Sequence, residues 1–190
     1  MGRSLPDILT PQEQDQLLNV FNLRYITPHR NKTMVRVLLD AGLRLSEMTN
    51  LKWRDINLMT GQLKVVQGKG AKDRVLYVGD TALEELKRWR ERQSDEWGDS
   101  DLVFTTRTLR PLDGKAVRKM LATYAAKAGI SKHVTTHTLR HTFASDLLRA
   151  TKNIRLVQKA LGHSDLSTTM IYTHIVDEEL EEAMKGFRVA

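Results

Sequence analysis

The sequence predicts an α+β fold that is mostly helical and contains one small antiparallel sheet of three strands. Hydrophobic residues recur at helical spacing on both sides of residues 53–78, and within that stretch they alternate as in half-buried strands. A chain of 190 residues, 41% of them hydrophobic, is long enough for one well-buried core. We therefore expect one globular domain in which helices surround the sheet.

The first helix is expected to begin after Thr10, which is a suitable N-cap. Pro11 fits the first helical position and Glu13 lies in the first turn. A second helix is expected in NKTMVRVLLDAGL, where Gly42 is a natural left-handed helix end. Arg44 would then lie just past a helix terminus.

Residues 53–78 are expected to form three short strands, separated by turns at Thr60-Gly61 and at Gly68-Lys69-Gly70. The second turn lacks the GxxxxGK[ST] pattern of a phosphate-binding loop, and no helix follows it directly, so a nucleotide site is not expected. DLVFTT resembles a further strand. The other helices are expected near residues 82–93, 114–128, 139–150, 154–161 and 177–185.

Charge is distributed unevenly along this basic chain, whose formal net charge is +7 and whose pI is near 9.7. Residues 111–160 hold ten basic residues and two acids, whereas residues 161–190 hold six acids and two basic residues. The basic middle favours a polyanionic partner such as nucleic acid. The chain has no cysteine, and no signal peptide or long apolar run is evident, so a cytoplasmic protein without a membrane partner is expected.

Two segments place polar side chains where they could act on a phosphate. In THTLRHTFASDLL, His137 and Arg140 are three residues apart and share a helix face. In LLDAGLRLSEMTNLKW, Glu47 could hold the Arg44 guanidinium by a bidentate contact. A zinc site from His137 and His141 is a weaker alternative, because no glutamate stands where HExxH requires it and no thiolate can complete the ligand set.

Four blocks together resemble the tyrosine recombinase, or phage integrase, family. AGLRLSEMTNLKW, GKGAKDR, HTLRHTFAS and LGHSDLSTTMIYTH occur in the order and approximate spacing of that family and look most like its Xer and mobile-element integrase branches. The resemblance covers residues 9–175 as a catalytic domain. It implies that residues 1–8 are a linker, that residues 176–190 form a tail helix able to dock on a neighbouring protomer, and that the usual N-terminal core-binding domain is absent.

The resemblance also implies a role for each matching residue. Arg44 and Arg140 would bind the phosphate, Lys69 would be the general acid, and Tyr172 would be the nucleophile. Two histidines would support them: His137 and His163. The Leu161-Gly162-His163 triplet would present the second one. Glu47 would support Arg44.

The implied activity is site-specific cutting and rejoining of double-stranded DNA through a 3′-phosphotyrosine, without metal, nucleotide or other cofactor. Four protomers would form the synapse. From the basic middle of the chain we expect DNA contacts by three cations: Lys115, Arg118 and Lys119.

Three other functions remain open at this stage. A type IB topoisomerase uses similar chemistry without sequence choice. A DNA-binding regulator could retain the same residues without using them, and a metal-dependent nuclease would require a metal that the phosphotyrosine scheme does not. Replacement of Tyr172 by Phe separates the enzyme from the regulator.

Overall fold

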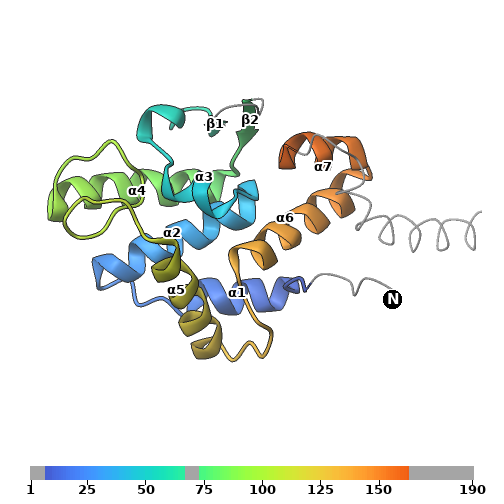
Figure 1. Cartoon of the computed structure of the whole chain (residues 1–190), viewed down its shortest axis with the longest axis horizontal. Coiled ribbons are helices and arrows are strands. Elements are labelled where there is room, and N and C mark those ends of the chain that lie inside the picture. Colours follow the sequence, from blue (N-terminus) through green and yellow to red (C-terminus); the bar gives the residue numbers. More distant parts are fainter. Residues whose placement is uncertain (1–6, 67–72, 163–190) are drawn as a thin grey trace, which may run out of the picture.

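Residues 7–66 and 73–162, which the computed structural model describes, form a mostly helical domain with a small antiparallel sheet (Figure 1). The expected α+β fold class is therefore confirmed. The elements in chain order are α1 (Pro11–Asn19), α2 (Ile26–Ala41), α3 (Leu45–Thr49), the 3₁₀ turn η1 (Trp53–Asp55), β1 (Gln62–Val65), β2 (Arg74–Tyr77), α4 (Asp80–Trp97), α5 (Gly114–Lys127), α6 (Thr136–Thr151) and α7 (Ile154–Leu161). The helix expected at 177–185 lies outside the described residues.

Helix α1 begins as the sequence predicts. The Thr10 hydroxyl accepts a hydrogen bond from the Glu13 backbone N–H at 3.2 Å, and the Glu13 carboxylate accepts one from the Thr10 N–H at 2.8 Å. This reciprocal capping box satisfies two backbone donors that the first turn of a helix leaves without intrahelical partners.

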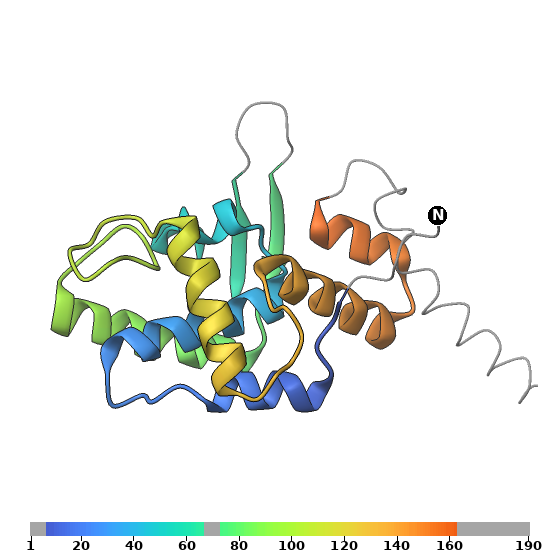
Figure 2. The same ribbon diagram turned by 60° about the horizontal axis from the view of Figure 1, so that its bottom comes forward.

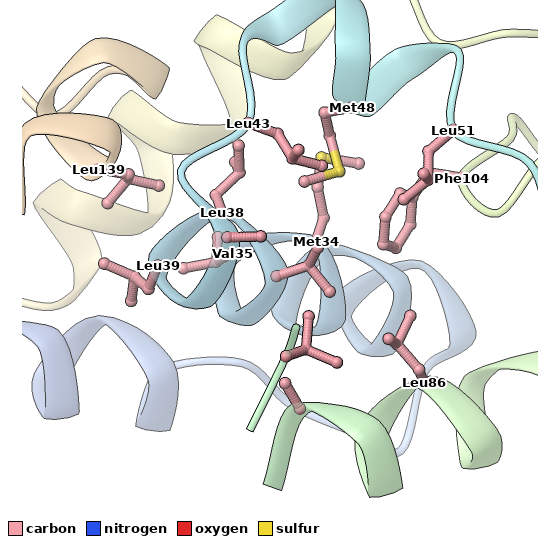
Figure 3. Close-up of a cluster of buried hydrophobic side chains, with 14 of the residues drawn as sticks. Met34, Val35, Leu38, Leu39, Leu43, Met48, Leu51, Leu86, Phe104 and Leu139 are labelled. Atoms are coloured by element: carbon pink, nitrogen blue, oxygen red, sulfur yellow. The ribbon is translucent and has the colours of Figure 1, made fainter. Parts of the chain in front are cut away.

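Helix α2 is the centre of the hydrophobic core. Met34, Val35 and Leu38 are almost completely buried on it, and α4 and α6 pack against it. Figure 3 shows side chains from the segments that follow, including Met48 and Phe104, converging on this helix. The 16-residue helix is thus held by packing on more than one side, which fixes the position of its C-terminal end.

The sheet has two strands in the described part of the chain, so the expected third strand is wrong. Strands β1 and β2 pair antiparallel with Leu63 opposite Leu76, and Ile56 adds only an isolated bridge to Leu63. The reason is the environment of Trp53: its backbone N–H donates to the Asp101 carbonyl at 2.9 Å, and its indole N–H donates to the Gln93 side chain at 2.9 Å.

The strand expected in DLVFTT is also wrong. Leu102 and Thr105 each make a single isolated bridge, to Lys52 and Pro111, and no strand develops around them. Val103, Phe104 and Thr105 are buried, and the Trp89 indole N–H donates to the Val103 carbonyl at 2.7 Å. Side chains from α4 therefore supply part of the hydrogen bonding that a neighbouring strand would otherwise supply.

Helices α6 and α7 carry a second, smaller apolar cluster. It consists of five buried residues: Phe143, Ala144, Leu148, Val157 and Leu161. Helix α7 packs against α6 and also against β2, and Figure 2 shows it beside both elements. The C-terminal end of α7 is thereby brought next to the sheet and to α6.

In the described part, no helix is both long enough and apolar enough to cross a membrane.

Candidate functional site

Arg140 is buried where three helices meet. Its side chain is on α6 and the residue is only 6% exposed, yet its guanidinium donates to two backbone carbonyls from other parts of the chain. One is the Leu161 carbonyl at the end of α7, at 2.6 Å, and the other is the Gly42 carbonyl at the end of α2. Both acceptors are helix C-terminal carbonyls, which carry partial negative charge and need partners.

Gly42 makes this arrangement possible. It ends α2 with φ 56°, in the left-handed region that the sequence predicts for it. A Cβ atom at this position would overlap the ring of Phe143. Glycine therefore allows α6 to approach α2 closely enough for Arg140 to reach the carbonyl of residue 42.

Arg44 lies two residues after Gly42, at the N-cap of α3. Its backbone N–H donates to Glu47 Oε2 at 2.8 Å and its Nη1 donates to Glu47 Oε1 at 2.9 Å. The expected contact between the two residues is thus present, but Glu47 does not grip the Arg44 guanidinium with both oxygens. The Arg44 side chain remains 39% exposed.

The bidentate partner of Glu47 is Arg74 on β2, which the sequence reasoning missed. Arg74 Nη1 and Nη2 donate to Glu47 Oε1 and Oε2 at 2.9 and 2.8 Å, and Arg74 Nε donates to the Ala160 carbonyl at 2.8 Å. One signal could have found it. Arg74, Leu76 and Val78 are two residues apart, so they share the inner face of the strand. An arginine on a buried face requires a partner for its charge.

These contacts set the charge state of Glu47. Burial by itself would raise the pKa of Glu47, but the hydrogen bonds and positive charge of Arg74, together with the bonds from Arg44, outweigh it and lower the pKa to about 2. Glu47 is therefore ionised at neutral pH. With Arg44 and Arg74 it forms a three-residue group of formal charge +1.

Two histidines lie on α6 beside Arg140. His137 is exposed in the first turn of the helix, and His141 is half-buried one turn later. Burial lowers the pKa of His141 below its ordinary value, and the neighbouring His137 and Arg140 lower it further. In residues 7–66 and 73–162 no group of three or more His, Asp or Glu is placed to hold a metal ion.

The three cations expected to contact DNA are all exposed on α5: Lys115, Arg118 and Lys119. The N-terminal residue of this helix, Gly114, lies against Leu45 of α3. The first turn of α5 is therefore beside the helix that begins at Arg44, so its cations extend the positive charge around the site.

Of the seven residues expected to catalyse or support the reaction, the structure brings four into one region: Arg44, Glu47, His137 and Arg140. The other three lie outside the described residues: Lys69, His163 and Tyr172. A hollow of about 1040 Å³ lies away from these residues and is lined by residues of η1, α4 and the segment 98–101. The described residues of the candidate site thus gather cations around one helix junction, an arrangement that suits the phosphates of a polyanion.

Comparison with known proteins identifies the family of this fold and site. The family described as the phage integrase family matches residues 7–179. The chain belongs to the phage integrase family. Among the curated members, a tyrosine recombinase XerD from Staphylococcus saprophyticus is 39% identical over 188 residues, covering 97% of this chain and 63% of that protein. A tyrosine recombinase XerC from Proteus mirabilis is 41% identical over 177 residues, covering 92% of this chain and 56% of that protein.

Solved structures of other family members have the same fold. The crystal structure of XerA recombinase matches with a TM-score of 0.84 and 32% identity, over 100% of this chain and 68% of that chain. The XerH site-specific recombinase bound to a palindromic difH substrate, in its post-cleavage complex, matches with a TM-score of 0.81 and 29% identity, over 97% of this chain and 54% of that chain. The present chain thus spans about three fifths of the length of the curated relatives it matches.

Proposed function

We propose that this protein is a site-specific tyrosine recombinase that cuts and rejoins double-stranded DNA through a 3′-phosphotyrosine intermediate. The observation that carries the proposal is the convergence of Arg44 and Arg140. Arg140 donates to the carbonyl of Gly42, two residues before Arg44, so the two arginines are held at the same helix junction. Family membership and the exposed cations of α5 support the same function.

In the proposed reaction, the Tyr172 hydroxyl attacks a DNA phosphate. As a bond forms between the tyrosine oxygen and phosphorus, the tyrosine proton passes to His137. The bond from phosphorus to the 5′-oxygen breaks, and Lys69 gives a proton to that leaving oxygen. Arg44 and Arg140 stabilise the charge that builds on the non-bridging oxygens. Attack by the free 5′-hydroxyl reverses these steps and rejoins the strand, so the reaction needs neither metal nor nucleotide.

The two histidines complete the proposed site. His137, in the first turn of α6, and His163 would assist proton movement at the tyrosine and hydrogen-bond the phosphate. Glu47 acts through Arg44. Loss of one direct phosphate contact should slow cleavage by about a hundredfold or more.

The proposed partners are double-stranded DNA and further copies of this chain in a tetrameric synapse. XerH, the relative described above, is bound to a palindromic substrate, and an inverted repeat of this kind recruits protomers in symmetric pairs. We place residues 176–190 on a neighbouring protomer in this assembly. The cytoplasm, where chromosomal and mobile-element DNA is accessible, is the proposed site of action.

A covalent-adduct assay tests the proposed function. A duplex is first selected from a randomised pool by binding at low salt. A nick is then placed at each position of its centre in turn. Cleavage next to the nick releases a short fragment that diffuses away, so the strand cannot be rejoined and the covalent complex accumulates. Incubation in excess chelator followed by denaturation is expected to leave DNA attached to protein.

The control is the Tyr172→Phe variant, which should bind the duplex with unchanged affinity and form no adduct. Binding by the parent protein without any adduct would favour the regulator. Cleavage that disappears in chelator would favour the nuclease. An adduct that persists in Tyr172→Phe would refute the assignment of the nucleophile.

A further inference from the structure

Arg74 is a buried, hydrogen-bonded side chain beside the candidate site, and it is not expected to touch DNA. Its side chain is 6% exposed, and all three nitrogens of its guanidinium donate hydrogen bonds. Two go to the Glu47 carboxylate and one goes to the Ala160 carbonyl. A buried guanidinium is retained only where its charge and its donors are matched, as they are here.

Glu47 is shared between two arginines, and each of its oxygens accepts hydrogen bonds from both residues. Oε1 accepts from Arg44 Nη1 and Arg74 Nη1, and Oε2 accepts from the Arg44 backbone N–H and Arg74 Nη2. Arg74 thus takes the bidentate, charge-neutralising position and Arg44 takes a single side-chain bond. The carboxylate charge is therefore shared, and the larger number of side-chain bonds to it comes from Arg74.

The remaining bond of Arg74 reaches the end of α7. Arg74 Nε holds the Ala160 carbonyl, and Arg140 holds the adjacent Leu161 carbonyl. Two arginines from different elements therefore fix consecutive carbonyls at this helix end. The planar fork of arginine can bond Glu47 and Ala160 at once, which the point charge of a lysine cannot do in the same geometry.

We propose that Arg74 is a positioning residue for strand cleavage: by pairing with Glu47 it leaves the positive charge of Arg44 available for the DNA phosphate. This inference rests on the proposed function. The formal charges of Arg44, Glu47 and Arg74 sum to +1, and this positive charge would attract the DNA phosphate. Removal of Arg74 would reduce the sum to zero.

The test compares single-turnover cleavage rates at saturating nicked duplex with affinities measured by gel shift. Arg74→Met is expected to slow cleavage by at least about tenfold, because the field at the phosphate weakens. Its affinity for the duplex should change by less than about threefold, since many other phosphate contacts carry binding. Arg74→Lys, which keeps the charge, should cleave faster than Arg74→Met and provides a measurement if Arg74→Met fails to fold.

Charge compensation distinguishes this role from a purely structural one. In the double variant Arg74→Met/Glu47→Gln the charge on Arg44 is no longer neutralised, so cleavage should be faster than in Arg74→Met. A double variant as slow as Arg74→Met, or an Arg74→Met protein that cleaves at the parent rate, would overturn the proposal. Equal rates for Arg74→Lys and Arg74→Met would do the same.

Arg30 offers a matched control. It is half-buried, and its guanidinium donates to the Thr105 carbonyl at 2.7 Å and to the Asn31 side chain, away from Glu47. Arg30→Met should destabilise the fold without slowing cleavage at a temperature where the protein is folded.

Absence of an adduct in the parent protein would count against the proposed function, whereas normal cleavage by Arg74→Met would count only against this inference.

Discussion

Replacing Glu47 by Gln should destabilise the fold by an amount that depends on pH. The Glu47 side chain is 9% exposed, and its arginine contacts lower its pKa from 4.5 to about 2. A fall of about 2.5 in pKa corresponds to about 3 kcal/mol of folding free energy at neutral pH. A similar cost, about 3 to 5 kcal/mol, is expected for removing one partner of a buried ion pair.

The direction of the pH dependence follows from the lowered pKa. Because the folded protein binds this proton less readily than the unfolded chain, the contribution of Glu47 is complete above about pH 4.5 and is lost as the pH falls toward 2. The variant lacks this titration. The difference in unfolding free energy between parent and variant should therefore be about 3 kcal/mol at pH 7 and about 1 kcal/mol at pH 3.

Urea unfolding followed by circular dichroism at several pH values between 3 and 7 measures this difference. Glu84→Gln is the control, since Glu84 lies at the surface of α4, where it pairs with Lys87, and the change should leave stability nearly unchanged at every pH. A difference that stays constant between pH 3 and pH 7, or one below about 1 kcal/mol at pH 7, would refute the reasoning.

Three further changes test the fold and the binding surface. Gly42→Ala should lower the unfolding free energy by about 2 to 4 kcal/mol, through the left-handed backbone and the overlap with Phe143. Thr10→Ala removes a helix cap and should cost about 1 kcal/mol in thermal unfolding. A triple variant of α5 replaces three residues by alanine: Lys115, Arg118 and Lys119. It should reduce the slope of log Kd against log salt by about 2 to 3 and leave the melting temperature unchanged.

Gly129 supplies the control for Gly42. It also has a positive φ, 75°, but a Cβ there would meet nothing within 4 Å. Gly129→Ala should therefore cost only the backbone strain, about 1 kcal/mol. Equal losses in the two variants would show that the contact between residue 42 and Phe143 contributes nothing, and a salt slope unchanged in the triple variant would remove α5 from the DNA interface.

Local signals were enough to predict several helix ends. Thr10 and Glu13 lie three residues apart, and their capping box needs nothing from the rest of the chain. Gly42 likewise ends α2 through its own backbone freedom. Features that depend on residues a few positions away could therefore be read from the sequence.

The errors came from partners distant in the chain. Trp53 was expected in a strand, but its hydrogen bonds go to Gln93 and Asp101, which lie 40 and 48 residues later. Alternation of polar and apolar residues reports burial and cannot reveal these partners.

The same limit applied to the site. Glu47 and Arg44 are neighbours in sequence and their contact could be predicted, whereas the bidentate bond to Arg74 spans 27 residues. The roles of Arg44, His137 and Arg140 were inferred from the family resemblance, and the geometry adds how Arg140 is held. The family itself is confirmed by the comparison.

Identification of the residue that carries DNA tests the central claim most directly. The adduct is digested with nuclease and trypsin, and the peptide that retains a nucleotide is sequenced by mass spectrometry. Cleavage after Lys159 and Lys185 gives one peptide that contains Tyr172. We predict a nucleotide 3′-phosphate on the Tyr172 oxygen of this peptide. A nucleotide on any other residue would contradict the account, as would strand cleavage with no modified peptide.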